Sequence, residues 1–310
     1  MIGYVFLYIF SFLVIWYVSG VIVTSVDRLA HKLNLSSFAV SFFLLGILTS
    51  IPEMSVGISA LIDEKPEIFV GNLIGGIVVI FLLIIPLLAI FGNGVKLTHQ
   101  MSKEHLILAL LIIIAPSVFT FDGLIGIPEG IMAVLLYLML IMMVEKRKGL
   151  FERIKDNIFH NKDYTDYDLI KILVGVVVVF LVSKYIVDTT IYFSQLFNIS
   201  SFLISLVIVA IGTNLPELSL VFRALSLKKK EVALGDYLGS AAANTGIFGV
   251  LILLGGSGFF VQNHFYQTFV FIAGGMTLFY IFARSKQDIS RAEGLVLLLV
   301  YILFLLMEVL

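Results

Sequence analysis

Residues 48–53 read LTSIPE and residues 212–217 read GTNLPE, and each stretch lies within a long apolar segment. Each stretch places a glutamate, Glu53 or Glu217, where a membrane-spanning helix passes through the middle of a bilayer. A carboxylate at that depth costs about 3 kcal/mol or more unless it has partners or water. Two carboxylates at matching positions therefore predict a functional site. The alternative is a pair of protonated glutamates that are hydrogen-bonded within the bundle and serve only structure.

The two stretches belong to a longer internal repeat. Pro52-Glu53 recurs 164 residues later as Pro216-Glu217. The same offset relates Asn34 to Asn198, Ser36-Ser37-Phe38 to Ser200-Ser201-Phe202, Thr49 to Thr213, Gly71 to Gly235, Gly75 to Gly239, Glu129-Gly130 to Glu293-Gly294, and Tyr137 to Tyr301. Because this offset needs no gap, residues 1–146 correspond to residues 165–310, and residues 147–164 form a polar linker.

Composition indicates a protein that faces lipid. Hydrophobic residues make up 60% of the 310 residues and charged residues only 13%, with a mean hydropathy of +1.10. The apolar segments predict ten helices, over residues 2–23, 37–62, 68–91, 105–121, 127–144, 169–193, 202–225, 232–259, 266–282 and 293–310. The predicted fold is an all-α integral membrane protein with ten transmembrane helices as two five-helix repeats. Disulfides and thiolate metal sites are excluded because the chain has no cysteine, and a net charge of −1 gives no indication of nucleic-acid binding.

An odd number of spans per repeat turns the second repeat upside down relative to the first, as in many secondary transporters. If the connections alternate between sides, one side receives 18 of the 20 basic residues, all except Lys65 and Lys184. The positive-inside rule makes that side cytoplasmic. Both termini are then expected outside and the linker inside, in a plasma (inner) membrane whose headgroup lipids contact the basic loops. Whether the chain forms a homo-oligomer is left open.

Each proline also predicts free oxygens beside its glutamate. Proline has no N–H, so the carbonyl four residues earlier loses its helical partner. In this chain those carbonyls belong to Leu48 and Gly212. The side-chain oxygens next to each proline belong to Thr49 and Ser50, and to Thr213 and Asn214. Carboxylate, carbonyl and hydroxyl oxygens together suit a hard cation such as Na⁺ or Ca²⁺.

The helices over residues 68–91 and 232–259 are expected to face these oxygens. The first carries Asn72 among glycines, and the second carries Asp236, Ser240 and Asn244 at intervals of four, which places them along one helix face. Glycines let membrane helices approach closely, so packing alone explains Gly75 and Gly239. It does not explain Asp236.

These stretches resemble the calcium/cation antiporter superfamily, in particular the prokaryotic sodium/calcium exchangers. That family carries Gly-Thr-Ser-x-Pro-Glu followed by Gly-Asn-x-x-Gly-Ser-x-x-x-Asn; here LTSIPE precedes GNLIGG, and GTNLPE precedes GDYLGSAAAN. The resemblance implies a transporter rather than an enzyme, with no organic cofactor. It implies exchange of Ca²⁺ for a monovalent cation, usually Na⁺, by alternating access. Glu53 and Glu217 would be the central ligands, flanked by Thr49, Thr213 and nearby carbonyls.

On the two facing helices the chain departs from the family pattern at four positions. Ile80 replaces an asparagine, Gly76 replaces a serine, Asp236 stands where asparagine is usual, and Asn244 stands where some members have aspartate. These departures keep open exchange of Ca²⁺ for H⁺, with Asp236 carrying the proton, and exchange of another cation for Na⁺. The more distant alternatives are a cation channel, an intramembrane enzyme, and a relative that binds ions without exchanging them.

Two further expectations concern the helices around the site. The first and sixth helices, over residues 2–23 and 169–193, contribute no site residues and are predicted to slide so as to open each side. Lys184 and Asp188 lie four residues apart near the outer end of the sixth helix, and this spacing predicts an ion pair on the helix surface.

Overall fold

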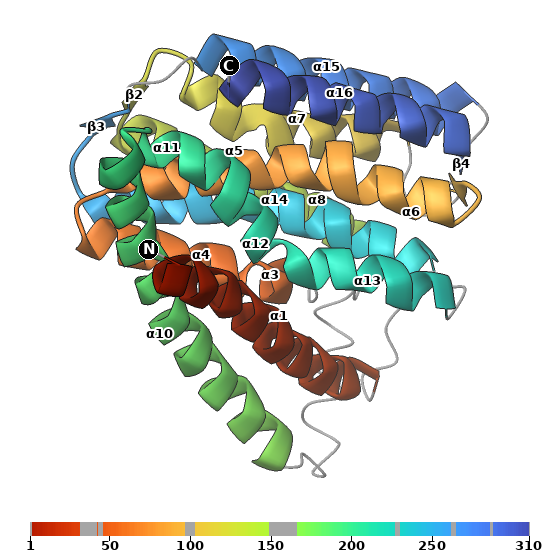
Figure 1. Cartoon of the computed structure of the whole chain (residues 1–310). Helices are drawn as coiled ribbons and strands as arrows, with labels where there is room; N and C mark the ends of the chain where they lie inside the picture. Colours follow the sequence, from red (N-terminus) through yellow and green to blue (C-terminus); the bar gives the residue numbers. More distant parts are fainter. Residues whose placement is uncertain are drawn as a thin grey trace.

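The computed structural model describes residues 2–31, 42, 46–96, 103–148, 166–226, 230–261, 265–285 and 288–309, and this part of the chain is largely helical (Figure 1). The predicted linker lies outside the described residues apart from its first two positions, which end a helix. The repeat marker Ser36-Ser37-Phe38 also lies outside them.

In the first half, the elements are α1 (Ile2–His31), α3 (Gly46–Thr49), α4 (Ile51–Ile62), α5 (Pro66–Val79), the π-helical turn η2 (Ile80–Ile84), α6 (Ile85–Phe91), β1 (Val95–Lys96), α7 (Lys103–Phe119), β2 (Leu124–Ile125) and α8 (Ile127–Lys148). In the second half, they are α10 (Asp166–Phe197), α11 (Ser201–Ile204), the π-helical turn η3 (Ser205–Val209), α12 (Ala210–Thr213), α13 (Leu215–Ser226), α14 (Lys230–Gly255), β3 (Phe259–Phe260), α15 (Phe265–Ser285), β4 (Asp288–Ile289) and α16 (Arg291–Val309).

The predicted apolar segments are mostly helical in their described parts. Four helices are each long and apolar enough to cross a membrane: Pro66–Phe91, Leu173–Phe197, Ala233–Gly255 and Tyr266–Arg284. A fifth crossing follows if Ser201–Thr213 and Leu215–Ser226, which meet at an angle of 45°, are one broken span. These helices and the composition make the chain a multi-pass membrane protein.

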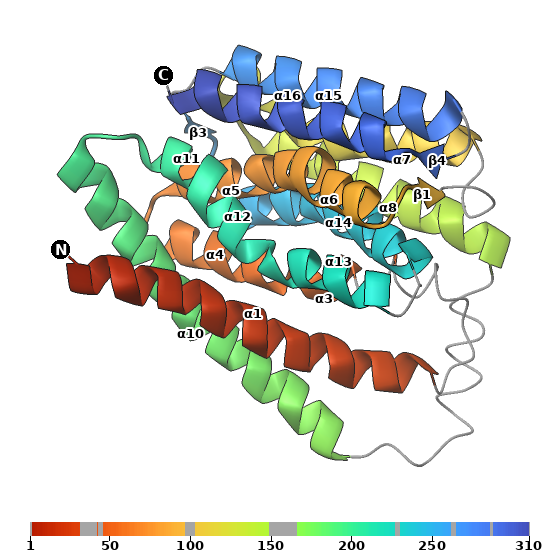
Figure 2. The same ribbon diagram turned by 45° about the vertical axis from the view of Figure 1, so that its right-hand side comes forward.

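The helices α5 and α14 lie at the centre of the bundle (Figure 1). Both contact the broken helices α3–α4 and α11–η3–α12–α13. On one outer face, α1 and α10 cross each other and stand apart from most of the bundle, as the turned view shows (Figure 2). On the opposite face lie α7, α15 and α16, with α8 packed along α14. The site elements are thus enclosed between two outer groups of helices.

Two short antiparallel strand pairs lie at opposite ends of the bundle (Figure 2). Val95 of β1 pairs with Ile289 of β4, and Ile125 of β2 pairs with Phe259 of β3. The offset of 164 residues converts the first pair into the second. The sequence analysis did not predict these strands, because two-residue pairings between loops leave no periodic pattern.

The repeated glycines allow symmetric close contacts between helices. A Cβ atom added to Gly75 of α5 would lie 2.1 Å from the Leu206 carbonyl oxygen, and one added to Gly239 of α14 would lie 1.9 Å from that of Phe42. The same repeat offset relates these two contacts. The predicted packing role of both glycines is therefore confirmed.

The repeated glutamates of α8 and α16 are helix caps. Glu129 accepts a hydrogen bond from the Gly126 N–H at 2.9 Å, and Glu293 accepts one from the Ser290 N–H at 2.7 Å. A glutamate at this position satisfies a backbone donor that the helix itself leaves unpaired. This explains why Glu129 and Glu293 recur without assigning either one to an ion site.

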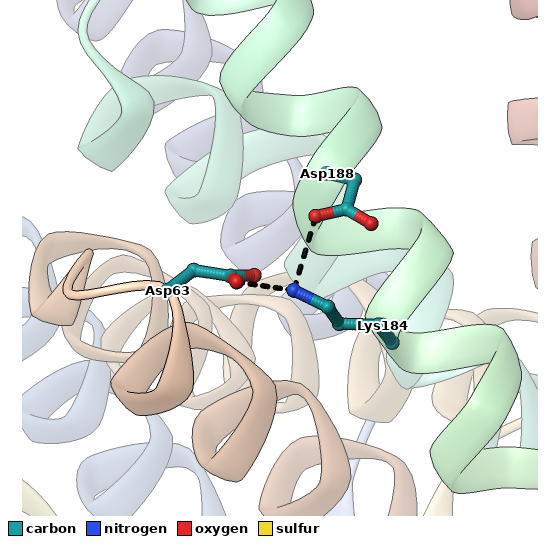
Figure 3. A network of polar contacts seen from close by, with 3 residues as sticks. All are labelled: Asp63, Lys184 and Asp188. Carbon is teal, nitrogen blue, oxygen red and sulfur yellow. Dashed lines mark hydrogen bonds and ion pairs between the residues drawn. The ribbon is translucent and has the colours of Figure 1, made fainter.

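A polar network joins α10 to the end of α4 (Figure 3). Lys184 pairs with Asp188 at 3.2 Å, which confirms the predicted ion pair within one helix. Lys184 also pairs with Asp63, the residue that follows α4. The network therefore connects an outer helix to one of the site-bearing helices, a contact that the sequence spacing did not reveal.

We expect Gly75→Ala to destabilise the protein by about 2 kcal/mol or more, because the new methyl group would collide with backbone that cannot rotate away. The matched control is Gly274→Ala on α15, where nothing lies within 4 Å of an added Cβ. That substitution should be neutral or slightly stabilising. Thermal unfolding in detergent measures both effects, and equal melting temperatures for the two variants would contradict the packing role of Gly75.

Candidate cation-binding site

Both glutamate-bearing helices are interrupted just before their prolines. Helix α3 ends at Thr49, Ser50 forms a turn and α4 begins at Ile51; α12 ends at Thr213, Asn214 forms a turn and α13 begins at Leu215. The Ser50 hydroxyl donates to the Gly46 carbonyl at 2.8 Å, and the Asn214 amide donates to the Ala210 carbonyl at 2.9 Å. Side chains at the two breaks therefore satisfy equivalent backbone carbonyls.

The breaks bring side chains of opposite repeats together. Asn214 of the second repeat donates to Glu53 Oε1 of the first repeat at 3.2 Å. Ser240 of α14 donates to Glu217 Oε1 at 3.0 Å, and its hydroxyl oxygen lies 3.1 Å from that of Ser50. Neutral groups thus hold one oxygen of each glutamate in place.

The threonines make equivalent contacts across the repeats. The Thr213 hydroxyl donates to Asn72 Oδ1 at 3.0 Å, and the Thr49 hydroxyl donates to Asp236 Oδ1 at 3.4 Å. Thr213 is also within hydrogen-bonding reach of Glu53, and Thr49 is within reach of Glu217. Each glutamate is therefore next to the threonine of the other repeat, an arrangement that pairwise sequence spacing cannot reveal.

Ten of the predicted site residues form one buried group, which we call the central polar cluster. Its members are Thr49, Ser50, Glu53, Asn72, Thr213, Asn214, Glu217, Asp236, Ser240 and Asn244, and all are at most 2% exposed. The other two predicted residues, Leu48 and Gly212, lie at the helix breaks, where the prediction assigns their backbone carbonyls rather than their side chains.

Several atoms of the central polar cluster have no protein hydrogen-bond partner. They are Glu53 Oε2, Glu217 Oε2, Asp236 Oδ2, Asn72 Nδ2, Asn214 Oδ1 and both polar atoms of the Asn244 side chain. A buried polar atom without a partner costs about 1–3 kcal/mol, and more if it is charged. Oxygen atoms predominate in this set, and a cation would satisfy them.

The acidic side chains of the cluster are too few, or too far apart, to coordinate a metal ion by themselves. Within the described part of the chain, no three side chains of the aspartate, glutamate, histidine or cysteine type are close enough to hold a metal ion. A cation in this cluster would therefore take its remaining ligands from hydroxyl, amide and carbonyl oxygens. This donor set suits Na⁺ and Ca²⁺, which bind oxygen and accept neutral ligands.

The structure adds two aromatic residues that the sequence analysis missed. The Tyr237 hydroxyl donates to the Glu217 backbone carbonyl at 3.1 Å. The Phe12 ring of α1 lies against Gly212, because a Cβ on this glycine would be 2.1 Å from Phe12 Cδ1. Tyr237 directly follows the predicted site residue Asp236, and this adjacency could have identified it from the sequence. Nothing in the sequence relates Phe12 to the site.

Comparison with known proteins identifies the family of this chain. The family described as sodium/calcium exchanger protein matches residues 3–144 and 168–310, which together make up most of the chain. The chain belongs to this family. The resemblance inferred from the motifs is therefore confirmed, and membership makes the protein a membrane transporter that exchanges inorganic cations.

Curated relatives match this exchanger over most of its length. The chain is 27% identical to the sodium/calcium exchanger MaX1 of Methanosarcina acetivorans, over 93% of each protein. It is 26% identical to the uncharacterized membrane protein MJ0091 of Methanocaldococcus jannaschii, over 96% of this chain and 95% of that protein. The inner membrane protein YrbG of Escherichia coli is 23% identical, over 80% of this chain and 77% of YrbG.

Solved structures share the fold. A structure of the sodium-calcium exchanger NCX_Mj soaked with Na⁺ and Sr²⁺ superposes with a TM-score of 0.70 at 24% identity, over 97% of this exchanger and 96% of that chain. Another, soaked with Na⁺ and Ca²⁺, superposes with a TM-score of 0.69. The likeness shows that this chain has the fold of that exchanger.

We expect Ser240→Ala to weaken Ca²⁺ binding about tenfold, because a hydrogen bond to a charged group contributes about 1.5–3 kcal/mol. The control is Ser59→Ala in α4, where the serine is equally buried but its hydroxyl has no protein partner. The rise in melting temperature with Ca²⁺ concentration reports the affinity. Equal affinities for the two variants would show that Ser240 neither orients Glu217 nor binds the ion.

Proposed function

We propose that the protein exchanges Ca²⁺ for Na⁺ across a membrane by alternating access, with Glu53 and Glu217 as the central ligands. The observation that carries the proposal is the pair of fully buried glutamates on two broken helices, each with one oxygen held by a neutral group and the other without a protein partner. Family membership and the likeness to NCX_Mj support the same function.

The ligand set that we propose extends from the two glutamates to the rest of the central polar cluster. Thr49, Ser50, Thr213 and Asn214 supply hydroxyl and amide oxygens, while Leu48 and Gly212 supply carbonyl oxygens. Asn72, Asp236, Ser240 and Asn244 form the facing walls on α5 and α14. A loaded site neutralises the glutamates, which lowers the cost of moving between the two faces of the membrane.

We further propose that the chain spans the membrane ten times as two inverted five-helix repeats, with residues 1–146 and 165–310 as the repeats. The two strand pairs support the inversion, because the repeat offset interchanges them and they lie at opposite ends of the bundle. The two stretches matched by the family, 3–144 and 168–310, agree with the same division.

The sidedness that we propose places the end with β1 and β4 in the cytoplasm. Basic residues gather in segments at that end: Lys96 in β1, Lys103 at the start of α7, Lys230 at the start of α14, Arg284 in the last turn of α15 and Arg291 at the start of α16. Lys230 also donates to the Gly94 carbonyl beside β1, at 2.8 Å. By the positive-inside rule the linker is then cytoplasmic and both termini are outside a plasma membrane.

We expect Glu53→Gln and Glu217→Gln each to reduce Na⁺-driven Ca²⁺ exchange about 100-fold or more, because each removes a charged ligand worth roughly 3 kcal/mol. The assay is ⁴⁵Ca²⁺ uptake into proteoliposomes loaded with Na⁺ and diluted into Na⁺-free buffer. The control, Glu129→Gln, keeps an oxygen that can cap α8 and should transport normally. Robust transport by both site variants would refute the proposed ligands.

The same vesicles distinguish the alternatives. Uptake driven by a pH gradient and not by Na⁺ would assign H⁺ as the counter-ion, and uptake without any counter-ion would indicate a channel. Binding of Ca²⁺ without uptake would indicate a relative that has lost exchange. We expect uptake only with a Na⁺ gradient.

We propose that α1 and α10 slide as one body against the remaining helices. The two helices are joined by a buried hydrogen bond of 2.7 Å between Tyr8 and Thr190, and Tyr8 packs edge-on against Phe193. Their contacts with the site-bearing helices include the Lys184–Asp63 pair, which a sliding motion would break (Figure 3). Phe12 would also leave Gly212, exposing one break to water.

A thiol cross-link tests this motion, because the chain contains no native cysteine. Asp63→Cys with Lys184→Cys, joined by a cleavable bis-methanethiosulfonate reagent, should stop exchange until a reductant cleaves the link. The control pair, Tyr8→Cys with Thr190→Cys, links α1 to α10 and should leave exchange intact after cross-linking. Full transport by the first pair when cross-linked would exclude a sliding α10.

A further inference from the structure

A buried hydrogen bond joins α14 to α7 at the edge of the central polar cluster. The Thr245 hydroxyl of α14 donates to the Ile112 backbone carbonyl of α7 at 3.0 Å. Thr245 is fully buried and directly follows Asn244, a member of the cluster. The bond therefore fixes α14 at the residue next to a proposed ion ligand.

A proline makes the Ile112 carbonyl available for this bond. Pro116 lies inside α7, four residues after Ile112, and has no N–H with which to continue the helical hydrogen bonds. A buried carbonyl without a partner is unfavourable, and in membrane proteins a serine or threonine of a neighbouring helix can satisfy the carbonyl that a proline frees. Thr245 does so here. The proline and the threonine are therefore two halves of one contact between helices.

The Asn244 side chain depends on the position of the α14 backbone. Neither of its polar atoms has a protein hydrogen-bond partner, so no side chain of the protein orients it. On the other side of Thr245, α14 packs closely against α8, because a Cβ on Gly246 would lie 2.4 Å from Tyr137 Cδ1. The backbone around Asn244 is thus held from α8 by packing and from α7 by the Thr245 hydrogen bond.

The other repeat lacks both the amide and the hydrogen bond. The offset of 164 residues converts Asn244-Thr245 into Ile80-Phe81, and it converts Pro116 into Tyr280. There the phenylalanine packs edge-on against Phe279 of α15, with ring centroids 5.0 Å apart. The same pair of helices is therefore joined by an aromatic contact where the wall is apolar, and by a hydrogen bond where the wall carries an amide. The fold alone does not require the hydrogen bond.

We propose that Thr245 is a positioning residue for cation binding, whose bond to the carbonyl freed by Pro116 holds Asn244 in place on the wall of the central polar cluster. Thr245 acts through Asn244 and is not itself a ligand. This inference rests on the proposed function and deepens it, because it gives α7 a part in the affinity for the ion although none of the cluster residues belongs to α7.

The test measures the affinity for ⁴⁵Ca²⁺ by scintillation proximity on the purified full-length protein in detergent. Thr245→Val keeps the shape of the side chain and removes the hydroxyl. We expect its Kd for Ca²⁺ to rise about tenfold, because groups that orient metal ligands typically contribute roughly 10–100-fold to affinity. Thr245→Ser keeps the hydroxyl and should bind Ca²⁺ as the unmodified protein does. An unchanged Kd in Thr245→Val would overturn the proposal.

The matched control is Ser117→Ala in α7. It removes a buried hydroxyl that donates within its own helix, to the Ile114 carbonyl at 2.7 Å, and it should leave the Kd unchanged. If this variant weakens Ca²⁺ binding as much as Thr245→Val does, the effect belongs to α7 in general and the assignment to Thr245 is wrong.

A double variant separates positioning from stability. Pro116→Ala supplies the N–H that bonds the Ile112 carbonyl within α7, so adding it to Thr245→Val should recover the melting temperature that the valine variant loses. The affinity should stay low, because α14 is still not tied to α7. Recovery of both quantities would leave Thr245 a purely structural role and overturn the proposal. The double variant also carries the measurement if Thr245→Val alone does not fold.

Asn244→Ala tests the residue through which Thr245 acts. In that background Thr245→Val should cause no further loss of affinity, since two changes that act through one group are not additive. A full additional loss would overturn the action through Asn244. The exchange assay on the two glutamate variants is independent of these measurements. A normal Kd in Thr245→Val, in a protein whose exchange requires both glutamates, therefore refutes the positioning role and leaves the proposed function standing.

Discussion

The burial of two carboxylates at the centre of an apolar bundle is the constraint on which the rest of this structure depends. Glu53 and Glu217 are fully buried, and removal from water strongly disfavours their charged forms. The protein meets part of this cost with neutral donors, Asn214 for one glutamate and Ser240 for the other. These donors hold one oxygen of each carboxylate, and the second oxygen has no protein hydrogen-bond partner.

That constraint accounts for the helix breaks. A continuous helix would keep its backbone oxygens in its own hydrogen bonds, whereas proline frees a carbonyl one turn earlier. Irregular backbone is tolerated at membrane depth only where protein or a polar site surrounds it. Here α5 and α14 surround both breaks, and Gly75 and Gly239 allow these helices to touch the backbone of the opposite repeat. The packing glycines and the proposed ion ligands therefore belong to one arrangement.

The outer helices α1 and α10 contact the rest of the bundle through side chains rather than through closely packed backbone. Tyr8 and Thr190 tie α1 to α10, while Lys184 and Phe12 form polar and aromatic contacts with the site-bearing helices. A surface ion pair is worth about 1 kcal/mol or less, so such a contact can be broken and remade during a transport cycle. The glycine-mediated contacts of the centre are backbone to backbone and do not offer this freedom. The contrast supports a rigid centre and a movable outer pair.

Much of the site could be predicted from the sequence, because the repeat offset and the two Pro-Glu motifs depend only on positions along the chain. They identified the broken helices, the flanking threonines, the polar face of α14 and the glycines of close packing. The tertiary structure decided which residues contact each other across the bundle. It brings Asn214 to Glu53, Phe12 to Gly212 and Lys184 to Asp63, and it pairs β1 with β4. Each of these contacts joins residues more than 100 positions apart. Local periodicity determines which face of a helix is polar, but only the packing of the whole bundle determines which helix that face meets.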